Sequence, residues 1–441
     1  MGRATGPVPA RVACVNLGCR VNRVELDDIA SELEAAGCVI CDEASADLVV
    51  VNTCAVTGEA EAKARKAVRH AAALPRMPWV VATGCVASLF EDEVASLGER
   101  VVVQRDKARV AGEALRLLGL VACEGDVGAC GHAGTPTGRT RPGVKVQDGC
   151  DNRCTYCIVW KARGRARSLD LDEAVARVAE RVASGAREVV LTGINLGRYE
   201  STSDGRTARL PELLDSLLRR TDVGRLRLSS VEPQDIDADL LRVMADSDGR
   251  VAPFLHVPLQ SGCDATLTAM NRAYDTAFYA RTVDAARCAL PDLSLGCDLI
   301  VGFPGETDAR FEESLSFCER MGFSKMHVFR YSRRPGTLAA EMDCQVEPRA
   351  SAERASRMRG LAARMRREAA LERVGHEELV LVQEPGRGVT GGLFDALVDN
   401  GCPGELVRAR VASCDGDLLD ARFSAGGPSE PGIRAGAILG M

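Results

Sequence analysis

The sequence predicts an α/β protein built from an N-terminal parallel α/β domain, a central partial (β/α)6 barrel and a small C-terminal β-barrel. From residue 11 to residue 340, short apolar strands alternate with helical patterns, which favours parallel sheets. After residue 375, short strands separated by glycines are typical of a small β-barrel. We expect domains at 1–122, 144–345 and 375–441, a linker at 123–143 and a connecting basic helix at 346–374.

The composition is that of a globular protein that is not basic throughout. Of 441 residues, 46% are hydrophobic and 27% are charged, with a net charge of −6. Any contact with nucleic acid must therefore come from local basic patches. No apolar run reaches about 18 residues, and residues 1–10 lack the apolar stretch of a signal peptide, so we expect no membrane association. The 18 cysteines are best placed in the reducing cytoplasm, where clustered cysteines favour metal or catalytic sites over disulfides.

Each of the first three long predicted strands is followed by a cysteine. The strands cover 11–16, 46–52 and 79–83, and the cysteines are Cys19, Cys54 and Cys85. Helical patterns at 22–36, 58–74 and 86–97 follow these strands, and 100–104 with 107–118 adds another strand–helix unit. Because ligands gather at the carboxyl ends of parallel strands, these three thiols are predicted to hold a metal cluster together. The alternative is that each is an ordinary small core residue, which is how we interpret Cys14, Cys38 and Cys41.

A second group of cysteines lies close together in the chain. Cys150, Cys154 and Cys157 have the spacing C-x3-C-x2-C, and thiolates are soft ligands that suit iron–sulfur clusters or zinc. In a four-iron cluster, three thiolates leave one iron open for an exogenous ligand, which with S-adenosylmethionine is the starting point of radical chemistry. The alternatives are a zinc knuckle with a remote fourth ligand, or three unrelated thiols.

Six strand–helix units follow the linker and predict an incomplete barrel that is open on one side. The strands are expected at 144–147, 187–191, 225–229, 254–257, 294–301 and 325–331. The clearest helical patterns cover 171–184, 210–219, 264–270, 276–289 and 308–321. In barrel enzymes the chemistry lies at the carboxyl ends of the strands, where this chain has polar residues and glycines.

These strand ends supply the candidate cofactor-binding residues: Gly193, Asn195, Ser229, Glu232, Gln260 and Gly302. A glycine such as Gly193 allows the backbone to approach a cofactor closely, and Gly302 lies near a helix N-terminus that suits an anionic or nucleoside group. The four polar side chains are suited to hydrogen-bond ribose or ammonium groups. Taken singly, each is more typical of ordinary loop chemistry, so the prediction rests on their shared face.

Charge and aromatic residues indicate where an RNA strand would lie. Residues 138–167 hold eight basic and two acidic residues, and Lys325, Arg330, Arg333 and Arg334 lie in another basic stretch. Tyr156, Trp160 and Tyr331 are candidates to stack an unpaired base. The helix expected at 347–374 has eight Arg and four Glu, which usually indicates a solvated face. Residues 375–441 hold ten acidic and five basic residues, a balance that opposes phosphate binding.

Ordered motifs over nearly the whole chain resemble the radical S-adenosylmethionine methylthiotransferases. In the barrel region these are VQDGCDNRCTYC, KARGRARS, VLTGINLGRY, LSSVEP, HVPLQSGCDATLTAMNR, IVGFPGET and YSRRPGT. In the N-terminal region they are NLGCRVNRVELD, NTCAVT and ATGC. The forms NLGCRVNRVE and RYSRRPGT look most like the branch that acts on N6-threonylcarbamoyladenosine at position 37 of tRNA.

The resemblance implies two 4Fe-4S clusters and S-adenosylmethionine. Cys150, Cys154 and Cys157 are expected to hold the radical-generating cluster, and Cys19, Cys54 and Cys85 the auxiliary cluster. The expected reaction adds a methylthio group to C2 of the modified adenine. The implied partners are the tRNA anticodon loop, an electron donor such as flavodoxin or ferredoxin, and a sulfur donor. The C-terminal module resembles the RNA-binding TRAM domain.

Two sites depart from the pattern of the family, and alternative functions follow from the remaining branches. Residues 158–161 are Ile-Val-Trp-Lys where the family often has Ile-Ile-Pro-Tyr, and residues 329–332 are Phe-Arg-Tyr-Ser where it often has Phe-Pro-Tyr-Ser. The alternative substrates are isopentenyladenosine-37 of tRNA and an aspartate of a ribosomal protein. A second alternative is a non-enzymatic protein that binds metal and RNA.

Overall fold

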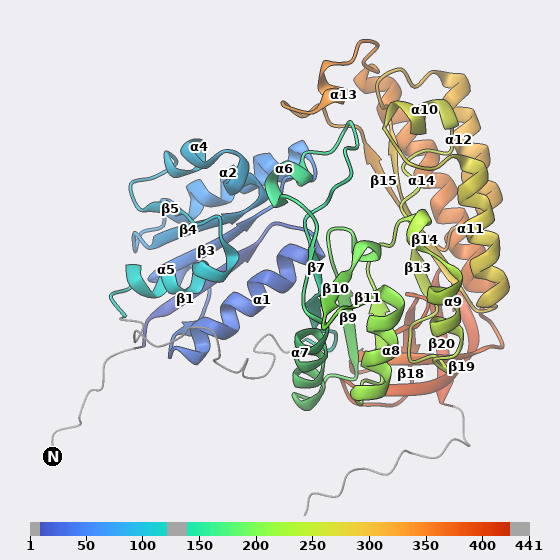
Figure 1. Cartoon of the computed structure of the whole chain (residues 1–441), viewed down its shortest axis with the longest axis horizontal. Coiled ribbons are helices and arrows are strands. Elements are labelled where there is room, and N and C mark those ends of the chain that lie inside the picture. The colour runs from blue at the N-terminus through green and yellow to red at the C-terminus, as the bar shows by residue number, and fades with distance from the viewer. Residues whose placement is uncertain (1–8, 121–138, 424–441) are drawn as a thin grey trace, which may run out of the picture.

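The computed structural model describes residues 9–120 and 139–423 and divides them into three parts (Figure 1). The N-terminal part, the central barrel and the C-terminal barrel have the architectures predicted from the sequence. The prediction of an α/β protein with a closed C-terminal β-barrel is therefore confirmed. Most of the linker predicted at 123–143, including Cys123, Cys130 and His132, lies outside the described residues.

The N-terminal part is a parallel sheet covered on both faces. Its strand order is β2-β1-β3-β4-β5, with β1 Arg11–Asn16, β2 Val39–Ile40, β3 Leu48–Thr53, β4 Trp79–Gly84 and β5 Val101–Val103. Helices α1 (Arg20–Ala35) and α5 (Val110–Leu117) cover one face, and α2 (Gly58–Ala72), α3 (Cys85–Leu89) and α4 (Glu91–Ala95) cover the other. Every residue of β3 is buried, and its first four residues (48–51) form an unbroken apolar run, as expected for a strand that is covered on both faces.

The central part has six parallel strands in the order β6-β9-β12-β13-β14-β15. They are β6 Gly143–Lys145, β9 Glu188–Thr192, β12 Arg225–Leu228, β13 Phe254–His256, β14 Ser294–Val301 and β15 Lys325–Arg330. An isolated bridge between Ser230 and His256 joins the two halves. The outer helices are α7 Leu171–Ala183, α8 Leu210–Arg220, α9 Ala238–Ala245, α11 Thr276–Ala289 and α12 Asp308–Met321, with the short α10 Asp264–Ala269 before α11.

The barrel is open between β6 and β15, which do not pair with each other in the described chain. Helix α1 of the N-terminal part packs beside β6 at this opening. The approach is close enough that a Cβ on Gly143 would lie 2.2 Å from Cγ2 of Val24, so this position requires glycine. The N-terminal part therefore covers one edge of the opening.

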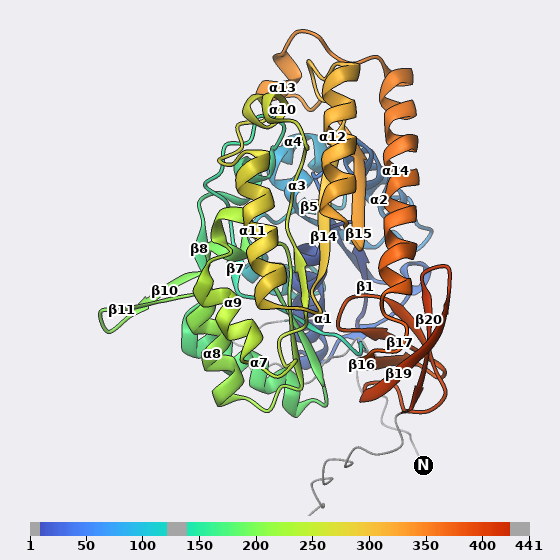
Figure 2. The ribbon, with the colours of Figure 1, turned by 90° about the vertical axis from the view of Figure 1, so that its right-hand side faces the viewer.

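The C-terminal part is a closed barrel of five strands below the core. The order is β16-β17-β18-β20-β19, with β16 Glu377–Glu384, β17 Arg387–Thr390, β18 Asp395–Val398, β19 Leu406–Asp415 and β20 Leu418–Phe423. Helix α14 (Pro348–Leu371) runs along β15 and leads into this barrel (Figure 2). Arg225 and Arg227 of β12 donate hydrogen bonds to backbone carbonyls of the C-terminal barrel, and Glu188 pairs with both guanidinium groups.

The structure differs from the sequence-based element list where local patterns are weak. The hairpin β10 (Glu200–Ser203) and β11 (Arg206–Arg209) is mostly polar and exposed, so it lacks the apolar signal of a strand. The helix predicted at 86–97 is divided into α3 and α4, because Phe90 leaves the helical region with φ −133° and ψ 51°. Strands β2 and β17 and helix α9 were also missed. Among the described residues, no helix is long and apolar enough to cross a membrane.

Candidate active site

The cysteine run at 150–157 is a loop fixed at both ends by backbone contacts. Gly149 has φ +71°, and a Cβ there would lie 1.9 Å from the carbonyl oxygen of Arg165, so only glycine fits. The amide of Cys150 donates to Gly164 O (3.1 Å), and the amide of Thr155 donates to Met270 O (3.1 Å). These bonds hold the three cysteines in one short loop beside the barrel.

The three thiols of this loop form one electrostatic group in a buried environment. Burial raises the pKa of Cys157 to about 12, with further contributions from Cys154 and Cys150. Arg272 donates to Cys154 Sγ at 3.2 Å and also pairs with Glu232. Thiolates this close repel one another unless a metal supplies positive charge, so the donor set fits an iron–sulfur cluster.

The structure brings Cys19, Cys54 and Cys85 together at the carboxyl edge of the N-terminal sheet. Cys19 is the residue before α1, Cys54 follows β3, and Cys85 opens α3 after β4. The Cys19 thiol hydrogen-bonds the Cys54 sulfur, which raises the pKa of Cys19 and lowers that of Cys54. Cys85 lies close enough to interact with Cys54 electrostatically. Three such thiols are also suitable ligands for a cluster.

Arg163 joins the two cysteine groups and was not identified from the sequence. It belongs to α6 (Val159–Arg163), shortly after Cys157, yet its Nε donates to Cys85 Sγ at 3.3 Å. Its other nitrogens pair with Glu25 and donate to Asn22 Oδ1 (2.6 Å). Glu25 also pairs with Lys107 and Lys145, and these cations lower its pKa to about 2 against the opposing effect of burial. The sequence signals were the density of basic residues in KARGRARS and the place of this segment among the motifs that carry the family resemblance.

Two of the predicted cofactor-binding side chains have buried polar atoms without partners. Asn195 Oδ1 and Ser229 Oγ are both buried and make no hydrogen bond to a described residue. Unsatisfied buried polar atoms are costly, and a bound polar cofactor would satisfy them. Asn195 is also tied to the cysteine loop, because its amide donates to Gln147 Oε1 (2.8 Å) and Gln147 Nε2 donates to Gly149 O (3.0 Å). These strand ends therefore offer buried hydrogen-bonding atoms to a polar ligand next to the cysteine loop.

The other predicted cofactor-binding residues differ in whether their polar groups already have partners within the protein. A Cβ on Gly193 would lie 2.8 Å from Gln147, so this glycine serves packing as well as access. Glu232 is held by Arg272, and Gln260 has φ +68° and lines a pocket. The amide of Gly302 donates to Glu306 Oε2 at 2.7 Å, so an internal carboxylate already occupies this N–H.

A pocket of about 170 Å³, here called the central pocket, lies between the two cysteine groups. It is lined by Cys157 and by the loop that follows Cys54, and its walls are largely apolar. Tyr156 and Tyr331 both line it, whereas Trp160 does not and is covered by Arg153 with 4.2 Å from the guanidinium carbon to the ring centroid. Two of the three predicted stacking residues are thus brought to one pocket.

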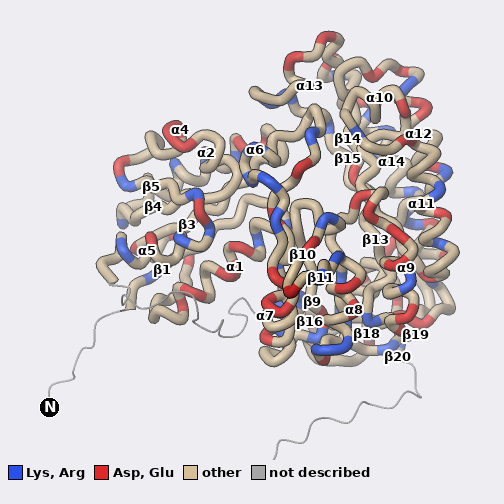
Figure 3. Tube along the Cα trace, in the orientation of Figure 1, with Lys and Arg blue, Asp and Glu red and all other residues tan. Residues whose placement is uncertain are grey.

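Most of the predicted basic RNA contacts are engaged within the protein. Arg330 donates to Pro348 O (3.0 Å), Arg333 to Ala340 O (2.7 Å), and Arg334 pairs with Glu61 (2.8 Å). The arginines of α14 pair mainly with acidic neighbours, so basic and acidic residues alternate over this side of the molecule (Figure 3). Arg330, which stands where the family often has proline, thus contacts the first residue of α14.

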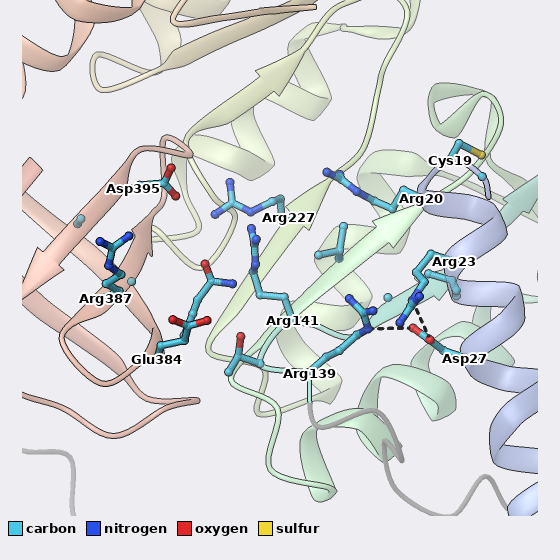
Figure 4. A pocket seen from close by; sticks show the side chains of 18 of the residues that line it. Cys19, Arg20, Arg23, Asp27, Arg139, Arg141, Arg227, Glu384, Arg387 and Asp395 are labelled. Carbon is cyan, nitrogen blue, oxygen red and sulfur yellow. Dashed lines mark ion pairs between the residues drawn. The ribbon is translucent and has the colours of Figure 1, made fainter. Parts of the chain in front are cut away.

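A second hollow, here called the arginine cavity, has a volume of about 660 Å³ and lies where the three parts meet. Its walls include Cys19 and three carboxylates (Asp27, Glu384, Asp395), and six arginines line it: Arg20, Arg23, Arg139, Arg141, Arg227 and Arg387. Figure 4 shows these side chains converging from α1, the residues before β6, β12 and the C-terminal barrel. Arg20, Arg141 and Arg387 form no ion pair with a described residue, which leaves a local excess of positive charge.

Comparison with known proteins agrees with this arrangement. A family model described as the Radical SAM superfamily matches residues 144–318, and one described as Uncharacterized protein family UPF0004 matches residues 11–104. The threonylcarbamoyladenosine tRNA methylthiotransferase MtaB of Thermotoga maritima is 33% identical over 93% of this chain and 98% of that protein. The chain belongs to the radical S-adenosylmethionine methylthiotransferase family.

Other methylthiotransferases are similar to this chain to nearly the same degree. The ribosomal protein uS12 methylthiotransferase RimO of Desulforudis audaxviator is 34% identical, covering 94% of this chain and 97% of that protein. Among solved structures, the radical S-adenosylmethionine methyltransferase TsrM of Kitasatospora setae has a TM-score of 0.54 at 16% identity, over 75% of this chain and 77% of that one. This likeness concerns the fold. As a radical SAM enzyme, the methylthiotransferase uses S-adenosylmethionine and a 4Fe-4S cluster.

Proposed function

We propose that this methylthiotransferase adds a methylthio group to C2 of N6-threonylcarbamoyladenosine at position 37 of tRNA. The observation that carries the proposal is the central pocket between two cysteine groups, in a chain similar over most of its length to relatives named for this substrate. Cys150, Cys154 and Cys157 would hold the radical-generating cluster, and Cys19, Cys54 and Cys85 a second 4Fe-4S cluster.

In this proposal the protein side chains bind the cofactor, orient the adenine and shield the reacting carbon from water. When bound, the cofactors supply a carbon radical and a sulfur source, which suit a C–H bond that has no acidity. Asn195 and Ser229 would hydrogen-bond S-adenosylmethionine, and Tyr156 and Tyr331 would hold the adenine between the two cysteine groups. The apolar walls of the pocket would exclude water from the reacting carbon.

The arginine cavity supports an anionic polymer as the substrate. Five of its six arginines come from the N-terminal part and the core, and only Arg387 comes from the C-terminal barrel. Phosphates bound there would compensate for the acidic balance of residues 375–441. The proposal also requires a one-electron donor such as flavodoxin or ferredoxin, a sulfur donor and a cytoplasmic location.

Nucleoside analysis of tRNA tests the proposal directly. Total tRNA from a strain lacking the gene is digested, and its nucleosides are compared with those of the parent strain and of a complemented strain. Loss of 2-methylthio-N6-threonylcarbamoyladenosine, restored by the wild-type gene but not by Cys154→Ser, is the expected result. Loss of the isopentenyl counterpart instead, or unchanged tRNA with loss of a methylthio group on a ribosomal protein, would reject the proposed substrate.

A further inference from the structure

Three side chains from neighbouring strands form a polar cluster inside the barrel, here called the carboxylate–imidazole cluster. His256 of β13, Asp298 of β14 and His327 of β15 meet because Asp298 is the register partner of His327. His256 Nε2 lies 3.2 Å and His327 Nδ1 lies 3.1 Å from the same oxygen, Asp298 Oδ1. No described residue hydrogen-bonds Asp298 Oδ2 or His327 Nε2.

One member of the cluster, Asp298, lines the central pocket, and His327 lies beside this lining residue. Asp298, Ile300, Phe329 and Tyr331 all line this pocket, and alternate residues of a strand share one face. His327 precedes Phe329 by two residues and therefore lies on the same face of β15, with 6.4 Å between the two ring centroids. The His327 side chain is 48% exposed, whereas the His256 side chain is 10% exposed. The solvent-facing end of the cluster is thus His327, next to the aromatic side chains of the pocket.

An apolar substituent on N6 of the target adenosine would suit the remaining walls of the pocket but not the carboxylate–imidazole cluster. Most of the other lining residues are aliphatic or aromatic. The two arginines that line the pocket already have partners within the protein, because Arg330 donates to Pro348 O and Arg334 pairs with Glu61. A ligand without polar atoms would desolvate Asp298 and His327 and leave them without new partners. Sites built to hydrogen-bond a substrate reject analogues that lack the matching group, often by large factors.

We propose that the carboxylate–imidazole cluster determines which substituent on N6 of the target adenosine is accepted, by binding the polar threonylcarbamoyl group. His327 Nε2 would donate to the threonyl carboxylate, and Asp298 Oδ2 would accept a hydrogen bond from the threonyl hydroxyl. His256 acts as a positioning residue that holds Asp298. The inference rests on the proposed function, because it concerns the substrate class of the same site.

The test compares RNA ligands on the anaerobically purified holoenzyme. Three anticodon stem-loops are used, which differ only in carrying N6-threonylcarbamoyladenosine, its carboxamide analogue or isopentenyladenosine. Binding is measured by fluorescence anisotropy for the wild type, His327→Phe, His327→Gln and Asp298→Asn. The control is His70→Phe, which changes an exposed histidine in the last turn of α2.

The wild type should bind the carboxylate-bearing RNA about 10- to 100-fold more tightly than the carboxamide analogue, the range for one hydrogen bond to a charged group. His327→Phe should abolish that difference and leave binding of the isopentenyl RNA unchanged or improved, while His327→Gln and Asp298→Asn should have intermediate effects. His70→Phe should retain the full preference of the wild type.

Two results would overturn the assignment. One is that His327→Phe retains the full preference for the carboxylate. The other is a stoichiometric metal besides iron that disappears in His327→Phe, because the three ligand atoms lie within 4.8 Å of one another and would then form a cation site. If the wild type methylthiolates none of the threonylcarbamoyl RNA, the proposed function fails, whereas turnover with unchanged discrimination rejects only the role of the cluster.

Discussion

Replacing Glu188 by Gln should release the C-terminal barrel from the core. The Glu188 carboxylate is fully buried and pairs with Arg225 and Arg227, whose guanidinium groups donate to carbonyls of Val389, Thr390 and Gly391. Burial opposes its ionisation, but the two arginines outweigh this effect and lower the pKa of Glu188 from 4.5 to about 2. A change of this size corresponds to about 3 kcal/mol, and breaking a buried ion pair from one side costs about 3–5 kcal/mol.

The assay follows the separation of the C-terminal barrel in urea. Protease cleavage after α14 reports when this barrel leaves the core, and Glu188→Gln should lower the free energy of that step by about 3 kcal/mol at pH 7. Glu353→Gln is the matched control, because Glu353 pairs with Arg349 on the surface, with the two side chains 65% and 92% exposed. An exposed pair contributes at most about 1 kcal/mol. The reasoning is refuted if the two variants have the same urea profile.

Three further predictions follow from the same contacts. The stability difference between wild type and Glu188→Gln should be full above pH 4.5, the ordinary pKa of Glu188, and should shrink as the pH falls towards 2; a difference independent of pH in urea titrations would contradict this. Cys54→Ser should lower the iron content after anaerobic reconstitution from about eight to about four atoms per chain, and retention of about eight would remove Cys54 from the ligand set. The double variant Arg20→Gln, Arg141→Gln should reduce the slope of log affinity for tRNA against log salt by about 1–2, with Arg349→Gln as the exposed control; an unchanged slope would exclude RNA phosphates from the arginine cavity.

The parallel architecture could be predicted because each buried strand is a short apolar run followed by a turn. The same rule located the cysteines, since the carboxyl ends of β1, β3 and β4 must share one edge of the sheet. The residues that complete the site could not be found this way. Arg163 and Glu25 are 138 positions apart, and their pairing depends on how two domains pack, which no local period encodes.

The predicted RNA-binding stretches show the same limit, because the sequence gives the number of charges but not their partners. Counting basic residues identified the stretches around 138–167 and 325–334, but not which guanidinium groups have internal partners. Arg333 and Arg334 are used by a backbone carbonyl and by Glu61, whereas Arg20 and Arg141 form no ion pair with a described residue. The net charge of a sequence segment depends only on its composition, whereas the charge that is free to bind a ligand depends on how the side chains pack.

The different chain separations of the two cysteine groups have a consequence for maturation. Cys150 and Cys157 lie on one short loop, so their thiols are near one another even before the domain has folded. Cys19, Cys54 and Cys85 meet only when three strands and their connecting helices have closed into one sheet. Delivery of iron and sulfide to the second cluster proposed above would therefore have to wait for long-range folding. A chaperone or a slow translation step that delays closure of the sheet would then delay assembly of this cluster and leave assembly of the first one unaffected.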